Sequence, residues 1–282
     1  MGYNPQIKSP MWAARTNVAR WYDKKGLPQP VGLWPMWESS GNIAFNYGSG
    51  ALQNSNVFGS GASFKADGVF YDGSSTAQVV LEPEDSFNQS EFTIVVTYHT
   101  LGDWETGGSD ANNNTIIIAR NTNTSSQNGW IIRILPTTGV LYLSLYTTNW
   151  VNTIFGGSGF NIGNHTIAAS IKQTTGTDSL YGDGKLISSE PGCSWAYTSD
   201  SRLKTGHDGN TSYWEEFKGT IKQVVLFSQQ LNAKQVALLY EEPYGALNPI
   251  SVPKYFFVSA APPSFQAAWA RNANTILQPG VF

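Results

Sequence analysis

The stretch from Asn164 to Ser188 constrains the fold more than any other part of the chain. From His165 to Lys172, mostly apolar residues alternate with mostly polar ones, and this two-residue period is typical of a strand with one buried face. A polar loop follows, and two short apolar runs then flank the dipeptide Asp183-Gly184. The dipeptide suits a type I′ hairpin turn, because both central residues of that turn need positive φ. The stretch therefore predicts three successive antiparallel strands, a pattern that a generic β-meander also shows.

Two other segments with strand-like patterns lie on either side of this hairpin, one before it in the sequence and one after it. Val69–Gly73 precedes a strand-like run at 77–81, and the apolar run 219–227 precedes a helix-like run at 231–240. Together with the hairpin, these segments resemble laminin-G-like, concanavalin-A-like jelly-roll domains in their order and spacing. The resemblance covers about residues 31–242 and implies an all-β fold, a two-sheet antiparallel β-sandwich with one short helix.

The sequence predicts three parts: an N-terminal arm at 1–30, the sandwich at 31–242 and a C-terminal arm at 243–282. Long polar loops separate the predicted strands of the sandwich. Further strands are expected at 77–81, 92–100, 115–120, 130–135 and 140–147, and loops at 102–114, 121–129 and 150–164.

Alternation within two predicted strands indicates which side faces the core. In 92–100, the positions 92, 94, 96 and 98 form a wholly apolar side. In 140–147, the three leucines should face the core, and the opposite side should be an outer or concave face. That outer side carries Tyr142, Ser144 and Tyr146.

Two helices are expected outside the strands. Met11 to Trp21 could form a short helix in the N-terminal arm. A second begins near Leu231, where Asn232 can cap the free amide groups with Gln235 as its reciprocal partner. Its apolar stripe would be Val236, Leu239 and Tyr240, and Pro243 would stop it.

Composition and charge exclude several classes of partner. Of the 282 residues only 13% are charged, and the net charge is −3, which gives no electrostatic footprint for nucleic acid or an anionic membrane. No window approaches the roughly 18–20 apolar residues of a membrane-spanning helix. One cysteine, Cys193, allows no intramolecular disulfide. We expect neither nucleic acid nor membrane insertion.

Both arms are rich in aromatic residues but too short to own a core. Such segments normally dock on another surface, either of the same chain or of a neighbour, so we expect assembly contacts or packing on the chain's own sandwich. The candidate assembly contacts are Trp12, Trp21, Tyr255, Phe256, Phe257, Phe265, Trp269 and Phe282.

The C-terminal arm carries the pattern Leu-Tyr-x-x-Pro-Tyr-x-x-Leu-x-Pro, then Tyr-Phe-Phe, then Ala-Trp-Ala-Arg-Asn-Ala-Asn. This pattern resembles the ends of laminin-G-like proteins encoded in tailed-phage genomes, which implies a component of a virion. The first ten residues lack the apolar core of a signal peptide. The expected location is therefore the virion surface after synthesis in the host cytoplasm, with other virion proteins and self-association as the expected partners.

No catalytic constellation stands out in the sequence. Retaining glycosidases need two carboxylates about 5–5.5 Å apart, and no predicted strand carries acids at alternate positions. Glu82 and Glu84 flank a proline, and Glu215 and Glu216 are adjacent. The three histidines are dispersed and no Gly-x-Ser-x-Gly motif precedes a helix. The sequence predicts a protein that is not an enzyme.

The long loops are the expected binding regions, because loops at the ends of a rigid sandwich are where recognition is usually built. Aromatic rings there could stack on sugars while amides bond to hydroxyl groups. The candidate glycan-binding residues are Trp104, Trp150, Phe155, Asn112 and Asn152. Calcium is the one ion whose oxygen ligands the loops could supply. Its candidate ligands are Asp103, Asp110, Asn112, Asp208 and Asn210.

Three functions follow in order of preference. The first is a non-enzymatic virion structural protein, a capsid decoration or head or tail surface component anchored by its arms. The alternative is a carbohydrate-binding adhesion module that contacts host or environmental glycans. A polysaccharide-cleaving enzyme is the third.

Overall fold

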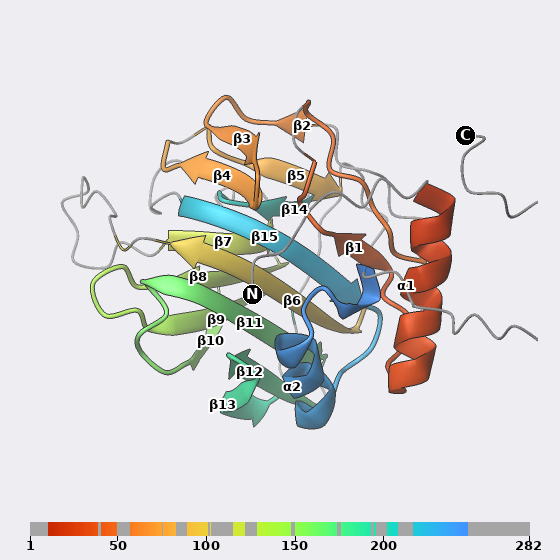
Figure 1. Ribbon diagram of the computed structural model, residues 1–282. Coiled ribbons are helices and arrows are strands. Elements are labelled where there is room, and N and C mark those ends of the chain that lie inside the picture. Colours follow the sequence, from red (N-terminus) through yellow and green to blue (C-terminus); the bar gives the residue numbers. More distant parts are fainter. Residues whose placement is uncertain are drawn as a thin grey trace, which may run out of the picture. The chain divides into compact units, whose positions relative to one another are not determined.

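The computed structural model is a β-sandwich with helices against one of its two sheets (Figure 1). It describes residues 11–38, 41–49, 57–74, 76–82, 89–100, 102, 115–121, 129–147, 150–173, 176–192, 195, 202–207 and 217–247. Contacts divide the chain into two compact units, Met1–Pro249 and Ile250–Phe282. All described residues lie in the first unit. The predicted fold class, a two-sheet antiparallel sandwich, is confirmed.

Within the described residues, one sheet has eight strands and the other has seven, and every strand pairing is antiparallel. The eight-stranded sheet runs in the order β13 (Lys185–Pro191), β12 (Thr177–Gly182), β11 (Gly163–Lys172), β6 (Glu91–Thr100), β15 (Lys218–Phe227), β4 (Gly68–Asp72) and β3 (Ala62–Lys65), with β1 (Gly32–Trp34) also paired to β15. The seven-stranded sheet runs in the order β10 (Trp150–Phe155), β9 (Leu141–Thr147), β8 (Gly129–Ile134), β7 (Thr115–Asn121), β14 (Arg202–Thr205), β5 (Val79–Glu82) and β2 (Val57–Phe58).

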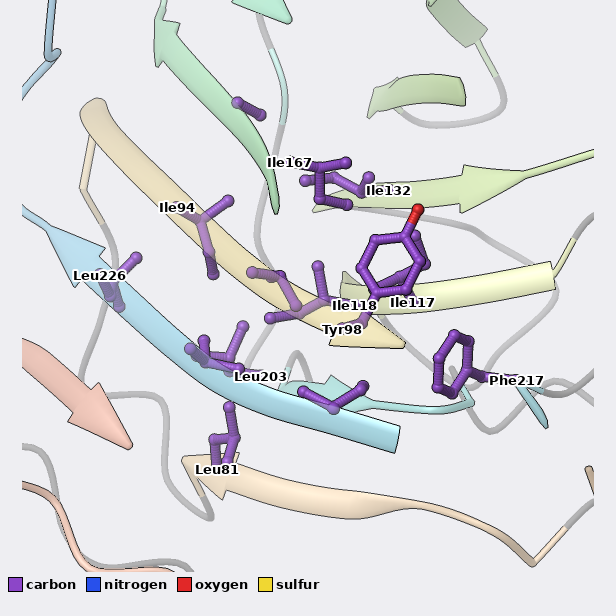
Figure 2. Packing of buried hydrophobic residues seen from close by; sticks show 14 of the residues in the cluster. Leu81, Ile94, Tyr98, Ile117, Ile118, Ile132, Ile167, Leu203, Phe217 and Leu226 are labelled. Atoms are coloured by element: carbon purple, nitrogen blue, oxygen red, sulfur yellow. The ribbon is translucent and has the colours of Figure 1, made fainter. Parts of the chain in front are cut away.

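The apolar core lies between the two sheets. On β6, the side chains of Phe92, Ile94, Val96 and Tyr98 are fully buried, as their alternation predicts. Figure 2 shows Ile167 of the eight-stranded sheet near Ile132 of the seven-stranded sheet, and Tyr98 near Ile118. The three leucines of β9 also belong to this core, so the predicted orientation of β9 is confirmed.

A second apolar cluster covers the other face of the eight-stranded sheet. Val95 of β6, Ala168 of β11 and Val225 of β15 lie on that face and are buried. They pack with apolar residues of α1 (Met11–Lys25), of α2 (Ala233–Glu241) and of the 3-10 helix η1 (Gly245–Leu247). The central strands β6, β11 and β15 are therefore buried on both faces. No helix within the described part of the chain is long and apolar enough to cross a membrane.

The N-terminal helix belongs to this packed unit. We predicted residues 1–30 as an arm, with Trp21 either as an assembly contact or packed on its own sandwich. The structure shows intramolecular packing, because Trp21 is buried beside Tyr22. A Cβ atom at Gly245 would lie 2.6 Å from the Trp21 ring, so the glycine of η1 lets the two segments meet. The side chain of Trp12 and all the other predicted assembly contacts lie outside the described residues.

The predicted hairpin is confirmed in detail. Strands β11, β12 and β13 are neighbours in the sheet, and the turn residues Asp183 and Gly184 have φ angles of 49° and 76°. One predicted loop is wrong in part, because residues 150–155 form the strand β10. Five of its six residues are β-branched or aromatic, the types that favour strands. Phe160, from the same predicted loop, is buried against the core.

Truncation tests where the first unit ends. A chain cut at the predicted boundary, after Glu242, would lack η1. Ala246 and Leu247 of η1 are buried against α1 and the sheet. We expect a chain ending at Pro249 to unfold at the temperature of the full chain, since the first unit remains complete. A chain ending at Glu242 should lose about 2–5 kcal/mol of unfolding free energy, measured by urea denaturation. Equal stability of the two truncated chains would contradict the packing described for η1.

The cap of α2 gives a second, smaller prediction. The predicted capping box is present: the Gln235 amide donates to Asn232 Oδ1 at 3.1 Å, and the Asn232 amide donates to Gln235 Oε1 at 3.0 Å. Asn232→Ala should lower the unfolding free energy by about 1 kcal/mol. Lys234 is exposed and lies two residues after Asn232. Lys234→Ala is therefore the control and should leave the unfolding free energy unchanged in the same urea titration.

Candidate functional site

The two outward sheet faces of the sandwich differ in what covers them. The outer face of the eight-stranded sheet packs against α1 and α2. In the described part of the chain no helix packs on the outer face of the seven-stranded sheet, which forms the far layer in Figure 1. Arg133 and Tyr142 on that outer face are half-buried and so keep part of their surface accessible; the part of the face around them is the candidate ligand site.

A cation and an aromatic ring meet on this face. The register pairs Arg133 of β8 with Tyr142 of β9. The guanidinium carbon of Arg133 lies 5.4 Å from the centroid of the Tyr142 ring, which is within the range of a cation–π contact. Both side chains are half-buried. Burial lowers the pKa of the Arg133 guanidinium, and the nearby Tyr146 and Tyr142 oppose this shift.

The adjacent row of the same face is more deeply buried. Ser144 and Ile131 pair across β8 and β9, and Ala119 pairs with Ile131 and with Lys204 of β14. All four of these residues are buried. Tyr146, two residues along β9, is buried as well and packs with Ala119 and Ile131. We predicted Tyr142, Ser144 and Tyr146 on an outer face, and the register confirms the face. Of the three, only Tyr142 is accessible.

His207 follows β14 and is almost fully buried. Burial lowers its pKa to about 4, and the positive charge of Lys204 adds to this effect. The ring is therefore neutral at pH 7. His207 and Lys204 are thus two buried polar side chains near the end of β14.

The residues that we predicted for glycan binding are only partly placed. Trp150, Asn152 and Phe155 lie in β10, the edge strand of the same sheet, and the register sets Phe155 opposite Tyr142 and Asn152 opposite Leu145. Their side chains are outside the described residues, as are Trp104 and Asn112 entirely. Phe155 therefore shares a register position with the Arg133–Tyr142 pair.

The predicted calcium ligands are not placed. Asp103, Asp110, Asn112, Asp208 and Asn210 all lie outside the described residues. Within the described ranges, no three side chains of His, Cys, Asp or Glu are grouped to hold a metal. Calcium stays a prediction for the loops.

Sequence reasoning missed Arg133 and Lys204. A weak indication of Arg133 was available, because it interrupts the apolar run Trp130–Ile134 at the position that alternates with Ile132 and Ile134. Lys204 had none, since β14 is four residues long and was not predicted as a strand.

A second polar pair lies at the hairpin turn. His165 Nδ1 is 2.9 Å from Asp183 Oδ2, and His165 Nε2 is 2.8 Å from the carbonyl oxygen of Ile162. Both partners accept hydrogen bonds only, so the doubly protonated imidazolium satisfies both. The other oxygen of Asp183 accepts from the amide of Thr166 at 2.9 Å. We predicted His165 as a structural residue, and this geometry agrees with that interpretation.

The pair shifts both pKa values. The hydrogen bond to Asp183 raises the pKa of His165, with the Ile162 carbonyl and the carboxylate charge assisting and burial opposing. Burial alone would raise the pKa of Asp183. The bonds from His165 and Thr166 and the charges of His165 and Lys185 lower it overall. Tyr98, whose ring lies 5.8 Å from His165, stays neutral because burial raises its pKa.

Comparisons with known proteins show the fold. No family model matches this chain, and no curated protein matches it. Its structure is similar to Trypanosoma rangeli sialidase in complex with 2,3-difluorosialic acid, over 82% of this chain and 38% of that chain, with a TM-score of 0.59 and 15% identity. It is also similar to the receptor-binding domain of botulinum neurotoxin type G, over 77% of this chain and 52% of that domain, with a TM-score of 0.54 and 17% identity.

A third similar structure is a separate module. The CBM40 of the Ruminococcus gnavus IT-sialidase bound to alpha2,3 sialyllactose covers 54% of this chain and 83% of its own length, with a TM-score of 0.43 and 16% identity. The chain spans less than two thirds of the sialidase and neurotoxin chains. At these identities the likeness is one of fold.

The His165–Asp183 pair predicts a pH-dependent stability. A raised His165 pKa gives stability that is complete below the unfolded value of about 6.5 and is lost as pH rises through the folded value. The lowered Asp183 pKa gives stability that is present above about pH 4 and is lost as pH falls further. Asp183→Asn retains a side chain that tolerates positive φ. We expect it to cost about 1 kcal/mol at pH 5.5 and less at pH 8.5.

Urea denaturation at the two pH values measures this difference. Asp67→Asn, which removes a largely exposed carboxylate beside Lys222, is the control and should show no such change between pH 5.5 and 8.5. A cost of Asp183→Asn that is the same at both pH values would refute the protonated state of His165.

Proposed function

We propose that this chain is a carbohydrate-binding module without catalytic activity, and that its ligand face is the outer face of the seven-stranded sheet. The observation that carries the proposal is the Arg133 guanidinium held 5.4 Å above the Tyr142 ring on that face. The register sets β10 beside this pair.

The pair offers the two kinds of contact that a sugar needs. A pyranose ring has an apolar face of C–H groups, which packs on an aromatic ring such as that of Tyr142. Its hydroxyl groups, and any carboxylate, accept hydrogen bonds from the five N–H groups of a guanidinium in a fixed fork. One aromatic ring and one guanidinium in contact can therefore offer an apolar surface and hydrogen-bond donors to the same sugar residue.

The sheet holds this pair with little freedom. Arg133 and Tyr142 stand on adjacent paired strands, above the fully buried Ile132, Leu141 and Leu143. A preorganised pair loses less conformational entropy on binding than two loop side chains do. Partial burial of Arg133 also places its charge in a medium less polar than water, where its hydrogen bonds are stronger.

The fold neighbours support the class of ligand and leave its identity open. The Trypanosoma rangeli sialidase, 38% of which matches this fold, is in complex with 2,3-difluorosialic acid, so an acidic sugar is the first ligand class to test. We propose binding without cleavage for this chain, because no pair of carboxylates accompanies Arg133 and Tyr142 in the described part of the face.

Glycan binding is testable on an array of acidic and neutral glycans followed by calorimetry. We expect the wild-type chain to bind, and Tyr142→Ala to weaken binding about tenfold or more, since stacking is lost. Arg133→Met keeps the apolar stem of the side chain and removes its charge. It should weaken the binding of acidic glycans more than the binding of neutral ones. Tyr240→Ala, an exposed tyrosine on α2, is the control.

Two outcomes would contradict the proposal. The first is the absence of binding to any glycan by the wild-type chain, both with and without calcium. The second is binding that Tyr142→Ala and Tyr240→Ala reduce equally. Circular dichroism of each variant separates lost binding from lost folding.

A structural role on a virion surface is the second candidate function, and it is compatible with the first. It is supported by the resemblance of the C-terminal arm to the ends of tailed-phage proteins. The experiment that tests it is incorporation of a chain lacking Ile250–Phe282 into particles, since the first compact unit ends at Pro249. Incorporation equal to that of the full chain would contradict an anchoring role for the arm.

A further inference from the structure

The strand β13 ends the eight-stranded sheet, and in the described part of the chain it pairs with β12 alone. It has seven residues, whereas β3, β10 and β2 at the other sheet ends have four, six and two. Five of its residues are exposed: Lys185, Leu186, Ser189, Glu190 and Pro191. A long, exposed edge presents unpaired amide and carbonyl groups, to which another strand can pair.

A β-bulge determines which face of β13 each of its side chains occupies. Tyr181 pairs with Leu186, whereas Leu180 pairs with Ser188, so Ile187 is the extra residue. Lys185 is opposite Gly182 and Glu190 is opposite Asp178. Residues 178 and 182 are four apart on a regular strand and share a face. The bulge therefore places Lys185 and Glu190 on the same face, although they are five residues apart.

This arrangement is complementary to itself. When β13 runs antiparallel to β13 of a second copy, with Ile187 left unpaired in both strands and a two-fold axis at Ser188, Lys185 of each copy lies opposite Glu190 of the other. Leu186 then lies opposite Ser189. Opposed charges on one face of an antiparallel pair stabilise it, and a two-fold axis repeats each contact. We propose that two copies of this chain associate through β13 and so join their eight-stranded sheets.

Exposed apolar side chains lie beside the same edge. The large apolar residues that are exposed in the described ranges are Ile43, Ile162, Leu186 and Tyr240, and two of these belong here. Leu186 is 52% exposed on the face that carries α2, and Tyr240 of α2 is 43% exposed and packs over Gly184 in the turn before β13. Association through β13 shields Leu186 and approaches Tyr240 from the second copy, which adds an apolar contribution.

The partner surface is limited in length. Pro191 has no amide hydrogen to donate and closes the ladder at that end, which leaves positions 185–190. Small interfaces of this kind are weak, so we expect a dimer at protein concentrations on the order of 100 µM. The proposal does not depend on glycan binding, because Arg133 and Tyr142 lie on the other sheet.

Charge reversal tests the pairing by sedimentation equilibrium of the full chain. Lys185→Glu alone and Glu190→Lys alone each set like charges opposite one another twice. We expect each to raise the dissociation constant about tenfold or more. The double variant Lys185→Glu with Glu190→Lys should restore the wild-type value. Lys234→Glu makes the same charge change on α2 and should have no effect.

Mixing the two single variants gives the decisive measurement. The Lys185→Glu chain has an acid at both positions, and the Glu190→Lys chain has a lysine at both. In an equimolar mixture, the acids of one chain therefore lie opposite the lysines of the other. We expect a heterodimer by native mass spectrometry, although each variant alone is monomeric. A monomeric wild-type chain at the stated concentration, single variants that dimerise as the wild type does, or a mixture that stays monomeric would each overturn the proposal. Melting curves of the variants confirm that each is folded.

Discussion

Burial of β6 on both of its faces is the constraint on which the rest of the structure depends. Ile94 and its neighbours at even positions fill the space between the two sheets, while Val95 on the opposite face is also buried. A strand whose two faces are both buried needs a covering layer on each side. The seven-stranded sheet supplies one layer, and α1, α2 and η1 supply the other. The one sheet face without described helical cover is the outer face of the seven-stranded sheet, and the candidate ligand pair lies there.

Sequence patterns predicted the parts of this fold that local chemistry determines. The turn at Asp183-Gly184, the capping box at Asn232 and the inward side of β9 all follow from residue types within a few positions. The strands β10 and β14 were not predicted. The four residues of β14, Arg202–Thr205, have no apolar alternation, and the strand exists because β5 and β7 pair with it on either side. Pairing between distant segments leaves little trace in a short strand.

The candidate site shows the same division. Alternation placed Tyr142 on the outer face, but nothing in the local pattern showed that Arg133 would lie against it, because their contact depends on the register of β8 with β9. The burial of Ser144 and Tyr146 also depends on tertiary structure. The predicted loop residues, such as Trp104, stay predictions, since they lie outside the described residues. A sheet face in a polar, loop-rich sandwich can thus bring together a cation and an aromatic ring that a search of its loops does not find.

The contact between Trp21 and Gly245 has a consequence for synthesis. The helix α1 is translated before the strands of the sandwich, yet the residues of η1 that help to bury its tryptophan are among the last of the compact unit to emerge. Strand β1 is also translated long before its pairing partner, because among the described strands it pairs only with β15. Buried aromatic side chains of a helix that still lacks its binding surface are exposed to the wrong partners during translation. Folding of this unit is therefore completed only when nearly all of it has been translated.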